Sequence, residues 1–217
     1  MNVDTIINST IEFVKQTLRN AEGGHDWWHI YRVWQLTKKI AETETVDSMV
    51  VELGALLHDI ADAKFHGGDE NVGPQLAQDF LQSQNVAPEI IEHVVNIIKN
   101  ISFGGGNNVQ SFKSIELDVV QDADRLDAMG AIGIARTFNY GGFKNREMYN
   151  PEKQPNLTMT KEEYRNSTAP TINHFYEKLL LLKDRMNTQT AKVMAKQRHQ
   201  FMELYLAEFY AEWEGKL

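Results

Sequence analysis

The sequence contains no cysteine. This absence excludes a disulfide framework, a thiolate nucleophile and sulfur ligation of zinc. It is typical of a protein that folds in a reducing compartment, and we predict a cytoplasmic location. Any metal ion bound by this chain must therefore take its ligands from histidine and carboxylate side chains.

Long apolar runs and an excess of positive charge are also lacking. No stretch reaches the roughly 20 apolar residues that span a bilayer, and the first residues lack the basic start and apolar run of a signal peptide. The formal net charge is −8, whereas proteins that bind nucleic-acid polymers usually carry a basic stripe. We therefore predict neither a membrane nor a nucleic-acid polymer as partner, and we expect any phosphate ligand to be small. Both a monomer and a homodimer are compatible with the sequence.

Strand-like alternation is scarce, whereas apolar residues recur at helical spacing along most of the chain. Hydrophobic residues make up 42% of the 217 residues and charged residues 24%, which suits a soluble globular core. We predict an all-α helical bundle in a single domain, 1–217. Its parts are expected to be a helical core over about 20–137, an irregular loop over about 140–169 and C-terminal helices over about 170–214.

Capping residues and periodicity give the expected helices. Asp26, Asp47 and Thr188 are predicted N-caps, and Ser114 is predicted to open one long helix through Asp124 towards Thr137. The expected helices lie over about 6–18, 26–42, 46–65, 72–82, 88–99, 114–137 and 171–187, with a last one from 188 towards 213.

Four residues with metal-ligand side chains occupy helix faces that would otherwise be apolar: His29, His58, Asp59 and Asp124. An unpaired buried carboxylate costs several kcal/mol, so such groups are usually paired or bound to a cation. Two imidazoles and two carboxylates form a mixed set of nitrogen and oxygen ligands. This set suits manganese, iron, nickel, cobalt or zinc, and suits magnesium less well. Asp122 is an alternative to Asp124.

The order of these residues resembles a known family. His29, the adjacent pair His58 and Asp59, and an aspartate within QDADRLDAMG follow the H…HD…D signature of the HD superfamily of metal-dependent phosphohydrolases. The stretches GGHDWWHIYRVW, LGALLHDIADAKF and QDADRLDAMGAIGIARTF are similar to bacterial HD hydrolases that include nucleoside triphosphate pyrophosphohydrolases. The resemblance covers most of the chain and implies the HD-domain helical bundle as the fold.

The resemblance also implies a function and a cofactor. One divalent ion, preferably manganese, would be held by the four residues, with Asp124 favoured over Asp122 because Arg125 and Asp127 complete a D-[KR]-x-D pattern. The expected reaction is cleavage of (deoxy)nucleoside triphosphates to monophosphate and pyrophosphate. A nucleotide phosphomonoesterase or phosphodiesterase, and a nucleotide-sensing module without turnover, are the alternatives.

Further residues are predicted to handle protons or substrate. By the same resemblance, Asp62, three residues after the HD pair, would orient water. His25 and Asp26 precede His29 by about one helical turn and are candidate proton-transfer groups, although helix capping also accounts for Asp26. Cationic or polar side chains able to contact substrate phosphates form a larger set. They are Arg32, Lys64, Lys144, Arg146, His174 and Lys178.

Overall fold

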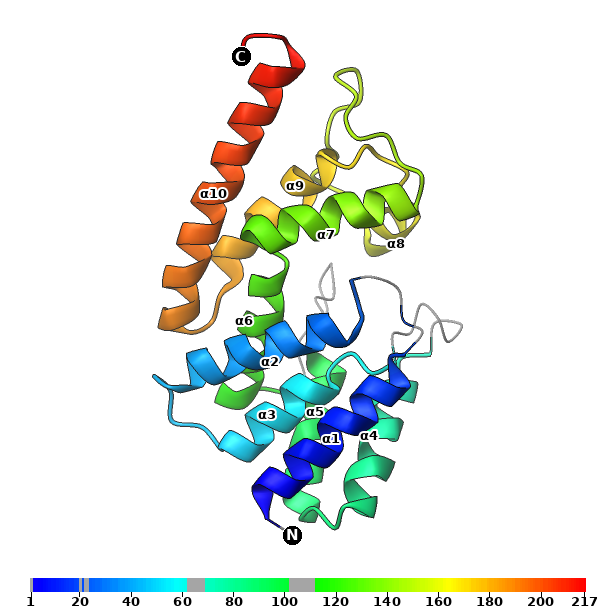
Figure 1. The fold of residues 1–217 in the computed structure, drawn as a ribbon, viewed down its shortest axis with the longest axis vertical. Coiled ribbons are helices and arrows are strands. Elements are labelled where there is room, and N and C mark those ends of the chain that lie inside the picture. Colours follow the sequence, from blue (N-terminus) through cyan, green and yellow to red (C-terminus); the bar gives the residue numbers. More distant parts are fainter. Residues whose placement is uncertain (1, 20, 22–23, 62–68, 102–111) are drawn as a thin grey trace. The chain divides into compact units, whose positions relative to one another are not determined.

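The computed structural model describes residues 2–19, 21, 24–61, 69–101 and 112–217 (Figure 1). These residues form helices joined by turns and loops, and no strand occurs among them. The prediction of an all-α protein is therefore confirmed. The helices are α1 (Val3–Thr17), α2 (Trp27–Ala41), α3 (Ser48–Leu57), α4 (Val72–Ser83), α5 (Pro88–Asn100), α6 (Ile115–Asp127), α7 (Gly130–Phe143), α8 (Lys161–Asn166), α9 (Asn173–Glu177), the 3-10 helix η2 (Leu179–Arg185) and α10 (Gln189–Trp213).

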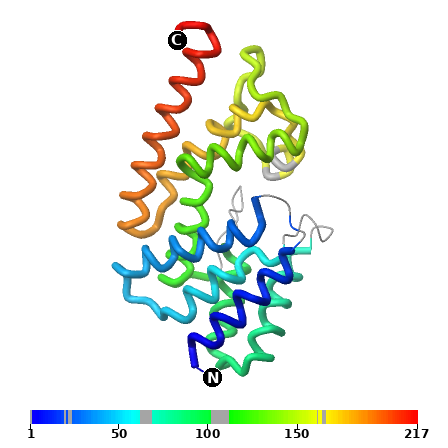
Figure 2. Tube along the Cα trace, in the orientation of Figure 1, coloured from blue at the N-terminus to red at the C-terminus, as the bar shows by residue number. Residues whose placement is uncertain are grey.

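The chain divides into two compact units, residues 1–124 and 125–217, with the boundary inside α6. Figure 2 traces the path of the chain through both. The prediction of a single domain stays a prediction. None of the helices in the described part of the chain is long and apolar enough to cross a membrane.

In the first unit, α3 is the central helix, because it packs against α1, α2 and α5. Seven of its ten residues are buried, so it is apolar on nearly every side. Gly54 brings α3 close to α5: a Cβ atom at this position would lie 3.3 Å from Ile97 Cδ1. The close packing fixes the C-terminal end of α3, from which the HD pair follows.

The predicted N-caps are confirmed. Asp26 Oδ1 accepts a hydrogen bond of 3.1 Å from the backbone N–H of His29 at the start of α2. Asp47 Oδ1 accepts bonds from two backbone N–H groups of α3, and Thr188 Oγ1 accepts one from Ala191 N at the start of α10. Each cap satisfies N–H groups that have no partner within the helix.

The prediction of one long helix from Ser114 towards Thr137 is wrong. α6 ends at Asp127 and α7 begins at Gly130. Gly130 has φ +67°, a left-handed conformation that glycine adopts without steric cost. The buried carboxylate of Asp127 accepts a 2.6 Å bond from Arg136 Nη1 in α7, which ties the two helices across this turn. Helical periodicity misses the turn because apolar residues continue through it.

The expected helix over 171–187 is also interrupted. α9 ends at Glu177, Lys178 has non-helical angles (φ −144°, ψ −57°), and η2 follows. Leu179 and Leu182 are both buried. Since a 3-10 helix repeats every three residues, it places these two leucines on one face, where an α-helix would separate them slightly. The loop expected at about 140–169 is irregular apart from the end of α7 and the short α8.

Candidate metal centre

His29, His58, Asp59 and Asp124 converge within the first unit. His29 Nε2 lies 3.2 Å from His58 Nε2, 3.6 Å from Asp124 Oδ1 and 4.0 Å from Asp59 Oδ2. The distance from His58 Nε2 to Asp124 Oδ1 is 3.8 Å. α2 supplies the first histidine, the chain just after α3 supplies the HD pair, and α6 supplies the last aspartate.

The cluster is buried on one side and open on the other. The side chains of His29 and His58 are 2% and 4% exposed, whereas that of Asp124 is 37% exposed. The imidazoles thus form an inner wall, and the carboxylate of Asp124 lies at the solvent side. A ligand that enters from solvent would meet the carboxylate edge first.

The periodic pattern predicted that the HD pair lies inside a helix over about 46–65. The structure instead places the pair just after the end of α3. α3 ends at Leu57, His58 is its C-cap, and Asp59 follows in a turn. His58 Nδ1 lies 2.8 Å from the carbonyl oxygen of Ala55. Because a carbonyl can only accept, this bond places the ring proton on Nδ1 and leaves the lone pair of Nε2 directed at the cluster. Metal-ligating histidines are usually oriented by such a bond.

His25 is a direct neighbour of the cluster, because its Nδ1 lies 2.6 Å from Asp59 Oδ2. Burial alone would raise the pKa of Asp59, but the hydrogen bond from His25 and the electrostatic influence of the neighbouring histidines outweigh it and lower the pKa to about 2. Asp59 is therefore ionised at neutral pH, as a metal ligand must be.

The spacing of the four side chains fits one metal ion. Nitrogen and oxygen ligands bind first-row metals at about 2.0–2.2 Å, so two ligands of one ion lie about 3.0–4.2 Å apart, depending on the angle between them. The distances from His29 Nε2 span 3.2 to 4.0 Å. Ligand atoms of His29, His58 and Asp59 all lie within 4.8 Å of one another. Two neutral imidazoles and two carboxylates would balance a divalent charge.

Comparisons with known proteins identify relatives of this chain. An HD domain model matches residues 27–129. The Bacillus subtilis protein YpgQ is 36% identical over 206 residues, which cover 94% of this chain and 91% of YpgQ. A solved structure of an HD-superfamily hydrolase from Bacillus thuringiensis is 43% identical, with a TM-score of 0.78, and the match covers 98% of this chain and 99% of that one. The chain belongs to the HD superfamily.

Domains of this superfamily bind divalent metal ions, and the His-His-Asp cluster of this chain has the corresponding residue types. A structure of YpgQ in complex with ADP is also similar, at 33% identity and a TM-score of 0.77. That match covers 98% of this chain and 97% of YpgQ. The predicted membership of the HD superfamily and its hydrolase class is therefore confirmed.

Other predicted residues of this HD hydrolase lie in the first unit. Asp26 caps α2, as described above, and a catalytic role for it stays a prediction. Arg32 is partly buried on α2, three residues after His29. Asp62 and Lys64 lie outside the described residues. Their roles, with that of His25, also stay predictions.

The remaining predicted substrate-binding residues lie in the second unit of the HD protein. Burial, together with the nearby charges of Lys178 and Arg146, lowers the pKa of His174 to about 3. The structure therefore brings these three residues together. Arg146 and Lys144 also line a cavity of about 470 Å³, in which the Cζ of Arg146 lies 5.5 Å from the ring centre of Tyr140.

We expect His174 to make the HD protein sensitive to acid. The folded state holds this imidazole neutral, whereas the unfolded chain binds a proton below about pH 6.5. Unfolding therefore takes up a proton, and stability falls as the pH drops from about 6.5 towards the lowered folded-state pKa. At about pH 5 the loss is about 1–2 kcal/mol.

Urea unfolding of the parent and of His174→Gln at about pH 7.5 and pH 5 measures this effect. The variant should lose about 1–2 kcal/mol less on acidification than the parent. The values at about pH 7.5, where both side chains are neutral, serve as the internal control. An equal acid loss in both proteins would rule out a His174 that the folded state holds neutral.

Proposed function

We propose that this HD-superfamily protein is a metal-dependent phosphohydrolase that cleaves (deoxy)nucleoside triphosphates to nucleoside monophosphate and pyrophosphate. The observation that carries the proposal is the convergence of His29, His58, Asp59 and Asp124 at distances that fit one divalent ion. The ADP bound to the related YpgQ supports a nucleotide as the ligand of this chain. Manganese is the proposed ion; the mixed nitrogen and oxygen ligands suit it, as they also suit iron, nickel, cobalt and zinc.

Each side chain of the proposed site has a distinct task. A divalent ion, when bound, supplies polarisation of a phosphoryl group and acidification of a water molecule. His58 is oriented by its bond to Ala55, and Asp59 is held in place by His25, so both present fixed ligand atoms. The part-exposed His25 can also hold or deliver a proton beside Asp59. Asp62 is proposed to orient the attacking water.

Charge balance at the substrate is the second requirement. A nucleoside triphosphate adds several negative charges to a site that already holds two carboxylates, so cations must approach it. We propose Arg32, Lys64, Lys144, Arg146 and Lys178 for this task, with the neutral His174 as a hydrogen-bond donor. The proximity of Lys178 and Arg146 to His174 supports this role, because their positive charges help to lower its pKa.

Product analysis tests the proposal. Metal-free protein is supplied with Mn²⁺ and a panel of nucleoside triphosphates, diphosphates and monophosphates, and the products are resolved by ion-exchange chromatography and ³¹P NMR. We expect equimolar monophosphate and pyrophosphate from triphosphates, and no turnover when a chelator is present. Orthophosphate released from monophosphates would instead establish a phosphomonoesterase. Orthophosphate and nucleoside diphosphate released from triphosphates would show cleavage between the β- and γ-phosphates and contradict the proposal. Parallel reactions with Fe²⁺, Co²⁺, Ni²⁺, Zn²⁺ and Mg²⁺ test the choice of ion.

A further inference from the structure

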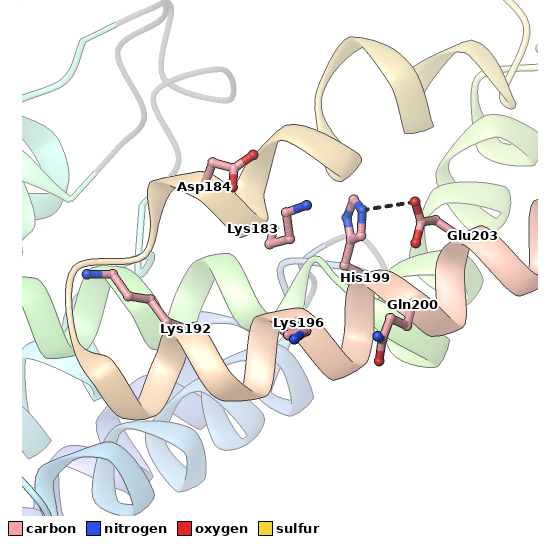
Figure 3. A pocket seen from close by; sticks show the side chains of 7 residues that line it. All are labelled: Lys183, Asp184, Lys192, Lys196, His199, Gln200 and Glu203. Atoms are coloured by element: carbon pink, nitrogen blue, oxygen red, sulfur yellow. Dashed lines mark ion pairs between the residues drawn. The ribbon is translucent and has the colours of Figure 1, made fainter.

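A second cavity, of about 520 Å³, lies between η2 and α10 in the second unit (Figure 3). It is distinct from the cavity near Tyr140, with which it shares no lining residue. Positively charged side chains are its main polar feature, and two acidic residues accompany them. The residues that matter here are Lys183, Asp184, Lys192, Lys196, His199 and Glu203.

The lysines of this cavity form no ion pair with a described residue. In the described parts of the chain, the amino groups of Lys183, Lys192 and Lys196 take part in no ion pair or hydrogen bond. Lys192 and Lys196 are four residues apart on α10, a spacing at which like charges destabilise a helix. Lys192 and Lys196 are exposed, so solvent screens their repulsion, but three positive charges around one cavity still favour an anion there.

His199 adds a second, independent observation. It lies seven residues after Lys192 and therefore on the same face of α10. Its Nε2 lies 3.3 Å from Glu203 Oε1, so this carboxylate is paired with His199. Its Nδ1 is buried and has no hydrogen-bond partner among the described residues. Figure 3 shows the ring and the side chain of Lys183 both directed into the space between η2 and α10. One polar atom of a lining residue is thus without a hydrogen-bond partner among the described residues.

The composition of the cavity narrows the class of ligand. Among the described lining residues, no aromatic ring other than that of His199 is present, so stacking on a nucleobase has no platform. Lysine ammonium groups bind phosphate as point charges. The volume falls within the range of about 300–1,000 Å³ that is typical of small-ligand sites, so more than one phosphate can be accommodated.

We propose that this cavity binds a linear oligophosphate, of the pyrophosphate class, through Lys183, Lys192, Lys196 and His199. Two elements supply the cations, so linked phosphates can contact η2 and α10 at once, whereas a single phosphate would reach fewer of them. The part of the ligand that the cavity would recognise is the phosphoanhydride chain. Its source is either free inorganic pyrophosphate or the phosphate chain of a nucleoside triphosphate. The inference does not depend on the reaction proposed for the metal centre.

Calorimetric titration of the full-length protein tests the proposal. The protein is treated with a chelator, so that the metal centre carries no ion, and is titrated at low ionic strength with orthophosphate, pyrophosphate, tripolyphosphate and ATP. The test variant carries Lys→Gln at 183, 192 and 196. The control variant carries Lys→Gln at the exposed residues 99, 113 and 216, which changes the net charge equally.

Pyrophosphate should bind the test variant about 30-fold more weakly than the parent, and the control variant within about 2-fold of it. Equal weakening in both variants, or equal affinity of the parent for orthophosphate and pyrophosphate, would overturn the proposal. ATP that binds as tightly as pyrophosphate would identify a nucleotide chain as the source, and weaker binding of ATP would identify the free anion. In either case the phosphoanhydride chain is the ligand.

A folding control separates binding from stability. Removing the lysines relieves repulsion, so the test variant should unfold at a urea concentration no lower than the control variant. If the triple variant fails to fold, Lys183→Gln alone replaces it, with an expected loss of pyrophosphate affinity of about 3-fold. Parental affinity in that single variant would then contradict the proposal.

Discussion

Replacing Asp59 or His58 with alanine is expected to lower the rate of pyrophosphate release by about 10³-fold or more. Each side chain supplies one ligand atom, and a metal ion contributes several kcal/mol to the stabilisation of a phosphoryl transition state. Loss of Asp59 also leaves His25 without its 2.6 Å partner. Loss of His58 removes an imidazole whose ring is oriented by the hydrogen bond from its Nδ1 to the carbonyl oxygen of Ala55. The effect should therefore appear in kcat and in bound metal together.

The measurement pairs steady-state rates in excess Mn²⁺ with metal content after gel filtration. Asp79→Ala is the matched control, because Asp79 is an exposed carboxylate on α4 in the same unit, bonded only to Gln75 among the described residues. It should retain the parental rate and metal content. Parental activity in Asp59→Ala and His58→Ala would show that hydrolysis takes place elsewhere in the protein.

The ligand set is the part of the site that sequence reasoning reaches most directly. Histidines and aspartates on apolar helix faces need compensation, and this physical requirement points to His29, His58, Asp59 and an aspartate of α6 before any coordinates are known. The family resemblance favours Asp124 over Asp122 for that last position. The structure places ligand atoms of the other three, His58, Asp59 and Asp124, within 4.0 Å of His29 Nε2. It adds the end of α3 at Leu57, which periodicity could not predict, because the pattern of apolar residues continues through Ile60.

Contacts between distant segments are the part that the sequence does not reveal. Lys192 and Lys196 resemble a solvated helix face when only α10 is considered. Their significance depends on Lys183 from η2, and η2 itself was predicted as part of one longer helix. The spacing of Lys192, Lys196 and His199 was the one available signal, and it is common in exposed helices.

The turn between α6 and α7 shows why single residues decide such geometry. Arg136 and Arg198 hold it from two sides: the first bonds the buried carboxylate of Asp127, and the second donates a hydrogen bond to the carbonyl of Leu126. Neither bond joins residues at helical spacing, so a periodic pattern in the sequence does not predict these contacts. The left-handed conformation of Gly130 permits the turn. The absence of a side chain at Gly133 lets the backbone of Ala128 approach α7 closely.

Gly133→Ala is expected to destabilise the protein by about 3 kcal/mol. A Cβ atom at this position would overlap the carbonyl oxygen of Ala128 and lie 2.5 Å from its carbonyl carbon. Both atoms belong to the backbone, so no side-chain rotation can relieve the overlap. The link between Asp127 and Gly130 would have to move, and the bond between Asp127 and Arg136 would be strained with it.

Gly142→Ala is the matched control, because it makes the same substitution in the same helix. A Cβ atom there meets no atom within 4 Å, so only the higher helix propensity of alanine remains, and we expect stabilisation of about 0.5 kcal/mol. Urea unfolding of the two variants should therefore shift in opposite directions from the parent. If both shifted alike, the close approach of residues 128 and 133 would not exist in solution, and the α6–α7 turn would be open enough to accept a side chain.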